Sequence, residues 1–325
     1  FCGMAPAILL FQLYALVLVT MLFFTQVFYL VMAVLSGIVA CLCNYLVITS
    51  MIGAFRLRAA SGTDWHALLS QLPGEERSGV VHIVLLPNYM ESEGTLKETL
   101  DNLALSRLAV SSVHVVLAME CREGAVVREK AERLVNETKH LFADIIIAYH
   151  PVGLPGEVPG KSSNIQWAFR EALRHYGPKL TTHDSSKVFF TVSDSDSLWH
   201  PQYFSCLTYQ ALMQTPEERN WKMWQPSILL LRNISSVPAL TRTSGHATLI
   251  CELSAMATQV PFPAEAHSAY SMTLALASHP DVDGWDVDVI AEDHHMFRKC
   301  YFAALWESAQ ASKAAATEQP IGLNA

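Results

Sequence analysis

The polarity pattern divides the chain into an apolar first part and a longer part in which apolar and polar stretches alternate. Residues 1–55 contain no Asp, Glu, Lys, Arg or His. A helix needs about 20 mostly apolar residues to cross a bilayer, so this run is long enough for two spans. We predict transmembrane helices at Ala7–Phe28 and Leu30–Ile52, with a break near Thr25 or near Ser36.

Two basic side chains, Arg56 and Arg58, follow the apolar run directly. Basic residues beside a membrane span are enriched on the cytosolic side. We therefore expect an integral membrane protein that contacts membrane lipid and carries its main domain in the cytosol. A secretory signal peptide is much shorter and begins with basic residues, and a hairpin buried in a soluble protein is the remaining alternative.

Beyond a polar segment at 59–78, which is typical of a linker or a short amphipathic helix, strands and helices alternate. Apolar runs predict buried strands at Val80–Leu86, Val113–Met119, Ile145–Tyr149 and Val188–Val192. Helical spacing predicts helices at Gly94–Leu105, Ala125–Phe142 and Ser162–Tyr176. Strands that alternate with helices indicate an α/β fold with a parallel sheet covered on both faces.

The second half of the chain has a less regular pattern. It predicts a strand, a helix, a short strand and a final helix, at Ser227–Leu231, Leu240–Thr258, Ala269–Met272 and Glu292–Leu305. The Ala-, Ser- and Gln-rich end favours a frayed tail. We expect a transmembrane segment, a linker, an α/β domain and a flexible tail, at 1–55, 56–79, 80–307 and 308–325.

Charge and cysteine content narrow the function classes. The net charge of −8 lies entirely outside the apolar run, and no basic stripe is present, so nucleic acid is an unsuitable partner. The seven cysteines include no C-x-x-C pair, which favours reduced thiols over a disulfide framework or a zinc site. Reduced thiols agree with a cytosolic domain.

Acidic residues follow the fourth predicted strand, in the sequence Ser193-Asp194-Ser195-Asp196-Ser197. Ligands of parallel sheets bind beyond the carboxyl ends of the strands. Mg²⁺ and Mn²⁺ prefer carboxylate and phosphate oxygens, so Asp194 and Asp196 could hold a metal that clamps a nucleotide diphosphate. The alternative is a solvated turn, because Ser and Asp are also common turn residues.

A Pro/Gly-rich loop leads into the third predicted helix through Gly160-Lys161-Ser162-Ser163-Asn164. The free N–H groups of a helix start, together with Lys161, could bind phosphate. The glycine spacing differs from that of a Walker A motif. The alternative is a helix capped by Ser162 or Ser163.

Two further acidic motifs flank the α/β pattern. In Pro87-Asn88-Tyr89-Met90-Glu91, Tyr89 could stack on a base and Glu91 could accept from a base or ribose, although acidic residues also suit a helix start.

In Glu292-Asp293-His294-His295, a carboxylate could act as a general base, or the acidic pair could simply favour the helix dipole. Because Glu292 and His295 share a helix face, His295 could be a metal or phosphate ligand.

Taken in order, these motifs resemble glycosyltransferase family 2. The matching residues are Pro87-Asn88-Tyr89-x-Glu91, Glu120 after the second strand, Lys161-x-x-Asn164, Asp194-Ser195-Asp196 and Glu292-Asp293. The strings P-N-Y, G-K-S-S-N, D-x-D-S and G-W-D…E-D-x-H-M are similar to a eukaryotic, membrane-anchored subgroup. The resemblance implies the GT-A fold, a Rossmann-like and mostly parallel sheet with flanking helices, preceded here by the transmembrane hairpin.

The resemblance also implies an activity: inverting transfer of a sugar from a nucleotide-sugar donor to a carbohydrate, lipid or protein acceptor. Asp196 would be the main ligand of Mn²⁺ or Mg²⁺, with Asp194 near the metal or the ribose. Asp293 would be the catalytic base, beside Glu292. The donor would contact Pro87, Tyr89, Glu91, Glu120, Lys161 and Asn164.

The chain departs from the family pattern at two points. Glu120 stands where the family usually has Asp, and no Q-x-x-R-W string occurs, so we expect either a non-processive enzyme or a sequence that ends before that motif. One alternative is a non-catalytic membrane scaffold with a GT-A-like domain. Another is a sugar nucleotidyltransferase, which usually has a Gly-rich loop after the first strand that residues 87–94 lack.

Overall fold

In the computed structural model, the chain is described over residues 5–230, 232–258 and 266–318. It divides into two compact units. Unit 1 comprises Phe1–Ala59 and Leu229–Ala264, and unit 2 comprises Ala60–Ile228 and Glu265–Ala325. The apolar beginning of the chain therefore shares a unit with a segment from the second half.

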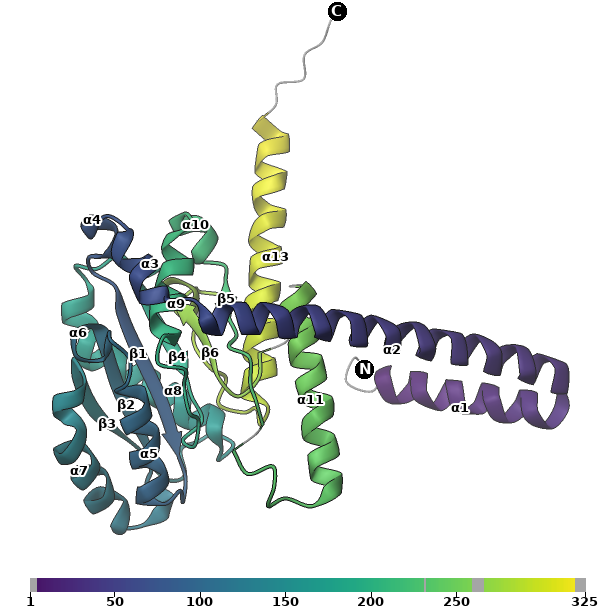
Figure 1. Ribbon diagram of the computed structural model, residues 1–325, viewed down its shortest axis with the longest axis horizontal. Coiled ribbons are helices and arrows are strands. Elements are labelled where there is room, and N and C mark those ends of the chain that lie inside the picture. Colours follow the sequence, from purple (N-terminus) through teal and green to yellow (C-terminus); the bar gives the residue numbers. More distant parts are fainter. Residues whose placement is uncertain (1–4, 231, 259–265, 319–325) are drawn as a thin grey trace, which may run out of the picture. The chain divides into compact units, whose positions relative to one another are not determined.

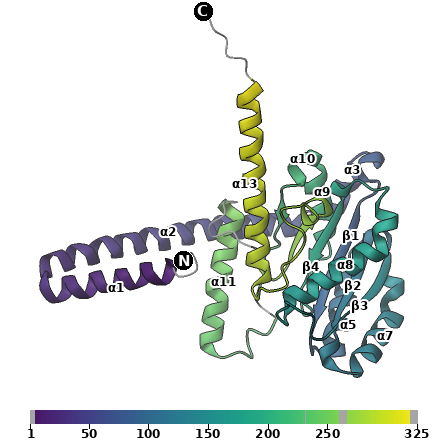
Figure 2. The same cartoon turned by 180° about the vertical axis from the view of Figure 1, so that it is seen from behind.

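The first unit is built from helices. Helix α1 spans Ala5–Phe23 and helix α2 spans Thr25–Gly62, so the break lies where the pattern near Thr25 predicts it. Ser36 lies inside α2. In both views α1 runs alongside the N-terminal part of α2 (Figures 1 and 2).

Within the described residues, α2 is the helix that is long and apolar enough to cross a membrane. Its most apolar 18-residue window has a mean hydropathy of 2.3 and is 0% buried. The neighbouring apolar stretch, Ala7–Phe23, is shorter. The prediction of a long apolar helix near the N-terminus is confirmed, and its insertion in a membrane stays a prediction.

Helix α11, Ala239–Thr258, packs closely on α2. A Cβ atom on Gly53 would lie 1.7 Å from the carbonyl oxygen of Leu253, so this approach requires glycine. Arg56 Nη1 donates to the carbonyl oxygens of Met256 at 3.0 Å and Ala257 at 2.8 Å. The positive guanidinium thus lies at the C-terminal end of α11, where the helix dipole is negative and favours a cation.

The second unit contains one six-stranded sheet in the order β3-β2-β1-β4-β6-β5. Its strands are β1 Val81–Asn88, β2 Val113–Glu120, β3 Asp144–His150, β4 Val188–Val192, β5 Met223–Trp224 and β6 Tyr270–Thr273. Strands β1 to β4 pair in parallel, whereas β6 pairs antiparallel with β4 and with β5. The predicted α/β architecture with a mostly parallel sheet is confirmed.

Alternate residues of the strands enter separate cores, because successive strand side chains point to opposite faces. Ile83 and Leu85 pack with helix α8, Lys161–Leu180. Val84 and Leu86 pack in the core that contains helices α5 and α7, Glu93–Leu103 and Val126–Thr138. The sheet is thus covered on both faces (Figure 1).

The remaining elements are helices α9 Tyr203–Leu212 and α13 Glu292–Glu318, the short helices α3 Trp65–Gln71, α4 Gly74–Arg77, α6 Ala109–Ser112, α10 Pro216–Arg219 and α12 Leu274–Ala277, and 3₁₀ turns at Cys121–Glu123, Lys139–Leu141 and Ser185–Lys187. The polar segment at 59–78 therefore contains the short helices α3 and α4. Residues 308–318, predicted as part of the tail, continue α13, because alanine-rich sequence favours helix. Residues 319–325 lie outside the described part of the chain.

One predicted strand is wrong. Within Ser227–Leu231, residues 227–230 form no strand, and Leu231 lies outside the described residues. The edge of the sheet is formed by Met223–Trp224 instead. Leu229 and Leu230 belong to unit 1 and are each 45% exposed, so their apolar character does not mark a buried strand of the sheet.

Candidate active site

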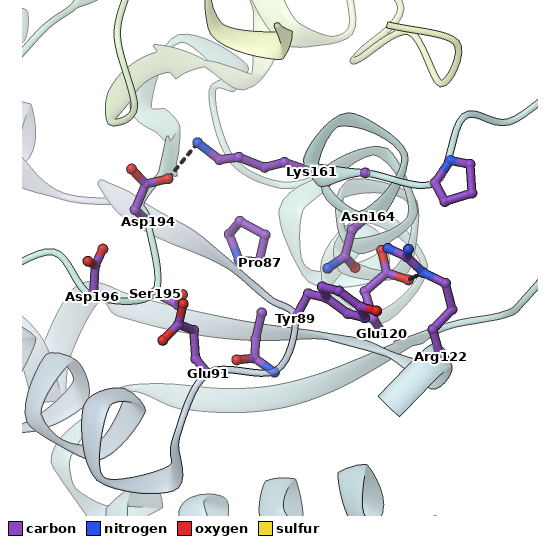
Figure 3. Close-up of a pocket in the computed structure, with 13 residues that line it drawn as sticks. Pro87, Tyr89, Glu91, Glu120, Arg122, Lys161, Asn164, Asp194, Ser195 and Asp196 are labelled. Carbon is purple, nitrogen blue, oxygen red and sulfur yellow. Dashed lines mark hydrogen bonds and ion pairs between the residues drawn. The ribbon is translucent and has the colours of Figure 1, made fainter. Parts of the chain in front are cut away.

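The strand order creates a switch point between β1 and β4. From β1 the chain moves outward through β2 and β3, and then returns to β4 on the other side of β1. Loops beyond such a point diverge and leave a crevice at the carboxyl ends of the strands. A cleft of about 390 Å³ opens there, lined by Pro87, Asn88, Tyr89, Glu91, Glu120, Arg122, Pro159, Gly160, Lys161, Asn164, Asp194, Ser195 and Asp196 (Figure 3).

The cleft brings together every predicted donor residue and both predicted aspartate ligands. Of the predicted site residues, Glu292, Asp293 and His295 lie outside its lining. Glu292 is nevertheless joined to the lining through Lys161, as the contacts below describe.

The acidic loop after β4 is fixed by hydrogen bonds on both sides. The backbone N–H of Ser193 still bonds to β1, at 3.1 Å. Thr99 on α5 donates its hydroxyl to the carbonyl oxygen of Ser195 at 2.8 Å. Asp194 and Asp196, which flank Ser195, both line the cleft (Figure 3). The loop is therefore an anchored turn that presents two carboxylates.

Lys161, the first residue of α8, makes three polar contacts. Its Nζ lies 2.6 Å from Asp194 Oδ1 and 2.5 Å from Glu292 Oε1, and it donates to the carbonyl oxygen of Ser268 at 3.1 Å. Burial acts to lower the pKa of Lys161, but the two carboxylates outweigh it and raise that pKa. One ammonium group thus pairs with two carboxylates that come from distant parts of the sequence.

Glu292 is the buried member of this group, with a side chain 2% exposed. The Tyr270 hydroxyl donates to Glu292 Oε2 at 3.4 Å, and Trp285 Nε1 donates to the Tyr270 oxygen at 2.6 Å. Burial raises the pKa of Glu292 to about 7, even though Lys161 opposes the rise. This carboxyl group therefore titrates near neutral pH.

Asp293 lies next to Glu292 at the start of α13 but has different partners. Its Oδ2 accepts the backbone N–H of Ser268 at 2.9 Å, and its Oδ1 accepts the N–H of His294 at 2.8 Å. The ring of His294 bonds to that of His267, with 3.0 Å between Nε2 and Nδ1. Asp293 is thus a half-buried carboxylate held by backbone donors.

At the other end of the cleft, an aromatic ring and a guanidinium lie together. The Arg122 guanidinium lies 4.3 Å from the centre of the Tyr89 ring, and Arg122 Nε donates to Glu120 Oε2 at 3.0 Å. Burial acts to raise the pKa of Glu120, but His150 and Arg122 outweigh it and lower that pKa. Glu120 is therefore held as a carboxylate.

Three buried oxygens in the lining residues have no hydrogen-bond partner within the described part of the chain: Asn88 Oδ1, Glu120 Oε1 and Asn164 Oδ1. The amide nitrogens are engaged, since Asn88 donates to Glu123 at 2.6 Å and Asn164 donates to the carbonyl oxygen of Ala118 at 2.9 Å. A buried acceptor without a partner is costly. This end of the cleft therefore favours a ligand that brings N–H or O–H donors.

His295 shares a helix with Glu292 but faces another partner. Its Nε2 lies 2.5 Å from Asp286 Oδ2, and Lys299 Nζ lies 2.7 Å from Asp286 Oδ1. Glu292 contacts Lys161 instead, so the two side chains predicted to share a face diverge at their tips. The metal role of His295 stays a prediction.

The donor set suits a hard divalent cation. Mg²⁺ is usually bound by one or two carboxylates, with waters and substrate phosphates completing its shell. Asp194 and Asp196 supply two carboxylates at the lining of an open cleft, where phosphate oxygens and water can reach them. The residues present therefore fit the predicted Mn²⁺ or Mg²⁺.

Sequence reasoning missed several residues of the site. Arg122 follows Glu120 by two positions, and Ser268 carries a left-handed φ of 46° that no local pattern signals. Tyr270 appears in the sequence only as part of a short apolar strand, and Trp285 as part of Gly-Trp-Asp. Their shared role around Lys161 and Glu292 depends on tertiary packing.

The fold and the cleft define a mixed α/β protein with two carboxylates and a lysine at the carboxyl ends of its parallel strands. No family model and no curated protein matches the chain. Among solved structures, it is similar to "Mannosyltransferase PcManGT from Pyrobaculum calidifontis in complex with GDP-Man and Mn2+", with a TM-score of 0.37 and 14% sequence identity. The match covers 77% of this chain and 62% of that one, which is less than two thirds of its length.

Proposed function

We propose that the protein is a membrane-anchored, metal-dependent glycosyltransferase with a GT-A-like domain of family 2. It transfers a sugar from a nucleotide-sugar donor to a carbohydrate, lipid or protein acceptor, with inversion. The observation that carries the proposal is the cleft at the switch point, which combines Asp194, Asp196 and Lys161 with an aromatic wall at Tyr89.

The chemistry of the two ends supports one orientation of the donor. The nucleoside lies toward Tyr89, Glu120 and Arg122, where a ring can stack and unpartnered oxygens can accept its N–H and O–H groups. The diphosphate lies toward Lys161 and the N-terminus of α8, whose free N–H groups favour anions.

Asp194 and Asp196 would hold the Mn²⁺ or Mg²⁺. A divalent ion bound there supplies positive charge that neutralises the leaving diphosphate. Lys161 adds a fixed positive charge from the protein itself, since its pKa is raised and it stays protonated. The residues thus stabilise negative charge that develops on the leaving group.

Asp293 is the proposed general base. The acceptor hydroxyl oxygen attacks the anomeric carbon of the donor sugar, the bond from that carbon to the diphosphate oxygen breaks, and the hydroxyl proton passes to Asp293. Two backbone N–H groups orient its carboxylate, at 2.9 and 2.8 Å, which supports a fixed base. A single displacement of this kind inverts the anomeric centre.

The apolar helices support the anchoring part of the proposal. No residue in the most apolar window of helix α2 is buried, and α1 runs beside it (Figure 2). Arg56 and Arg58 follow the apolar run, and this favours a cytosolic active domain.

A donor screen tests the proposal. The purified full chain in detergent is incubated with radiolabelled nucleotide-sugars, with and without Mn²⁺, and transfer or hydrolysis of the sugar is measured. We expect turnover that requires Mn²⁺. Metal-dependent thermal stabilisation by a nucleotide-sugar without any turnover would contradict the enzyme assignment and leave a binding protein, and a scaffold would show neither effect.

A further inference from the structure

One lysine in the cleft, Lys161, forms ion pairs with two carboxylates, of which Asp194 is partly exposed and Glu292 is buried. We propose that Lys161 is a built-in cation that neutralises Asp194 until a divalent ion binds, and that Glu292 is the positioning residue that retains Lys161 when Asp194 is given up. The inference rests on the proposed function in one respect, namely that Asp194 takes part in metal binding.

Lys161 is already paired with two carboxylates before any ion binds. Its Nζ forms ion pairs with Asp194 Oδ1 and Glu292 Oε1 and donates a hydrogen bond to the carbonyl oxygen of Ser268. The ammonium therefore already satisfies the carboxylate that a divalent ion would need. Two cations on one carboxylate repel each other, so the ion and Lys161 compete for Asp194.

Burial decides which contact of Lys161 breaks. The Asp194 side chain is 34% exposed, whereas that of Glu292 is 2% exposed. Water or a metal ion can replace Lys161 at Asp194. Water and metal ions cannot reach the buried Glu292, so breaking its ion pair with Lys161 leaves an unpaired buried charge or forces the carboxylate to take up a proton, and both are unfavourable. Lys161 therefore stays with Glu292 when an ion takes Asp194.

The Glu292 side of the arrangement is rigid. Its second oxygen is held by the Tyr270 hydroxyl, which in turn accepts from Trp285 Nε1. All three residues are buried, with whole-residue exposures of 3% for Glu292, 0% for Tyr270 and 2% for Trp285. After Asp194 is released, the ammonium keeps its contacts with Glu292 and the Ser268 carbonyl, and the side facing Asp194 becomes available to a diphosphate oxygen.

This arrangement predicts opposite changes in two affinities, measured on the full chain in detergent. Mn²⁺ binding is followed by the electron paramagnetic resonance signal of the free ion, without nucleotide. Anion binding is followed by calorimetry with inorganic pyrophosphate in the absence of metal. Lys161→Met should tighten Mn²⁺ binding about three- to tenfold and weaken pyrophosphate binding by a similar factor, since one charged contact is lost or gained.

Glu292→Gln should change both affinities in the other direction. With Glu292 replaced by a neutral amide, Lys161 pairs with Asp194 alone and holds it more strongly, so Mn²⁺ should bind more weakly. The cleft also loses a negative charge, so pyrophosphate should bind more tightly. General damage to the cleft would weaken both ligands together. Such parallel weakening in Glu292→Gln, or an unchanged or weaker Mn²⁺ affinity in Lys161→Met, would overturn the proposal.

Two further variants keep the experiment decisive. Lys161→Met combined with Glu292→Gln leaves no unpaired buried charge and no change in net charge, and it should still bind Mn²⁺ more tightly than the unmodified chain. Lys299→Met removes the lysine of another Lys–Asp pair, 2.7 Å from Asp286 and outside the cleft lining, and should change neither affinity. If Lys299→Met increased the Mn²⁺ affinity as much as Lys161→Met does, the increase would be explained by the change in net charge alone, and the proposal would be overturned.

The outcomes also separate this inference from the proposed function. If Mn²⁺ and Lys161 compete for Asp194 in a chain that transfers no sugar, the enzyme assignment is refuted and the competition stands. If the chain transfers sugar but Lys161→Met leaves the Mn²⁺ affinity unchanged, the competition is refuted and the enzyme assignment stands. Absence of Mn²⁺ binding in the unmodified chain would overturn both.

Discussion

The backbone of Ser268 joins Asp293 to Lys161. Its N–H donates to Asp293 Oδ2 at 2.9 Å, and its carbonyl oxygen accepts from Lys161 Nζ at 3.1 Å. Ser268 holds a left-handed φ of 46°, which is uncommon for a residue other than glycine. One residue with an unusual backbone conformation therefore contacts both the proposed base and the cation of the donor end.

Replacement of Ser268 tests this link. Ser268→Gly should keep both backbone contacts and leave the unfolding midpoint equal or slightly higher, since glycine adopts this φ without strain. Ser268→Val should destabilise the fold by about 1–3 kcal/mol, because a β-branched side chain is strained there. Thermal unfolding and turnover are the measurements, and a Val variant as stable as the Gly variant would contradict the argument.

Asp293→Asn tests the proposed base. The amide oxygen can still accept from Ser268, but it cannot take a proton, so transfer should fall by about 10²- to 10⁴-fold while donor affinity stays nearly constant. Kinetics with saturating donor and a separate binding measurement distinguish the two effects. Asp288→Asn, an exposed aspartate of the same unit, is the matched control and should retain full turnover.

The titration of Glu292 predicts a pH dependence of stability. Its pKa is about 7 in the folded protein, against 4.5 for the unperturbed group, so between these values the folded state binds more protons than the unfolded state. Stability should therefore decrease as the pH rises from about 4.5 to 7, by about 3 kcal/mol from this group at most, and level off above 7.

Glu292→Gln isolates this contribution. An amide does not titrate, so the change in unfolding midpoint between pH 5 and pH 8 should be smaller in the variant than in the unmodified chain. Thermal unfolding at the two pH values measures it. The same difference in both proteins would show that Glu292 is not the group responsible.

Much of the α/β unit could be predicted from the sequence, since each of the first four strands is a mostly apolar run that is followed by polar residues. The predicted Val188–Val192 agrees with β4 over its full length. The predicted strand Ser227–Leu231 is wrong because an apolar run does not reveal which unit it belongs to. Leu229 belongs to unit 1, whereas the sheet lies in unit 2. Apolar character predicts burial in general, and only the fold assigns the partner.

The site could be predicted in part for the same reason. Strand ends converge in any parallel sheet, so Glu91, Glu120 and Asp194 were expected on one edge. The contact between Lys161 and Glu292 could not be foreseen, because it depends on where the fold brings the start of α13 relative to the start of α8. The sequence likewise carries no sign that Arg122 would stack on Tyr89.

Tyr89 tests the nucleoside end of the cleft. Its side chain is 47% exposed and lies beside Arg122, so it can offer a flat face to a base. Tyr89→Ala should weaken donor binding by about 1–3 kcal/mol, the usual contribution of a base stacked on an aromatic ring, and leave the maximal rate with saturating donor nearly unchanged. Tyr89→Phe retains the ring and should bind the donor almost normally. Steady-state kinetics over a range of donor concentrations measure both, and equal losses in the two variants would assign the effect to the hydroxyl group and not to stacking.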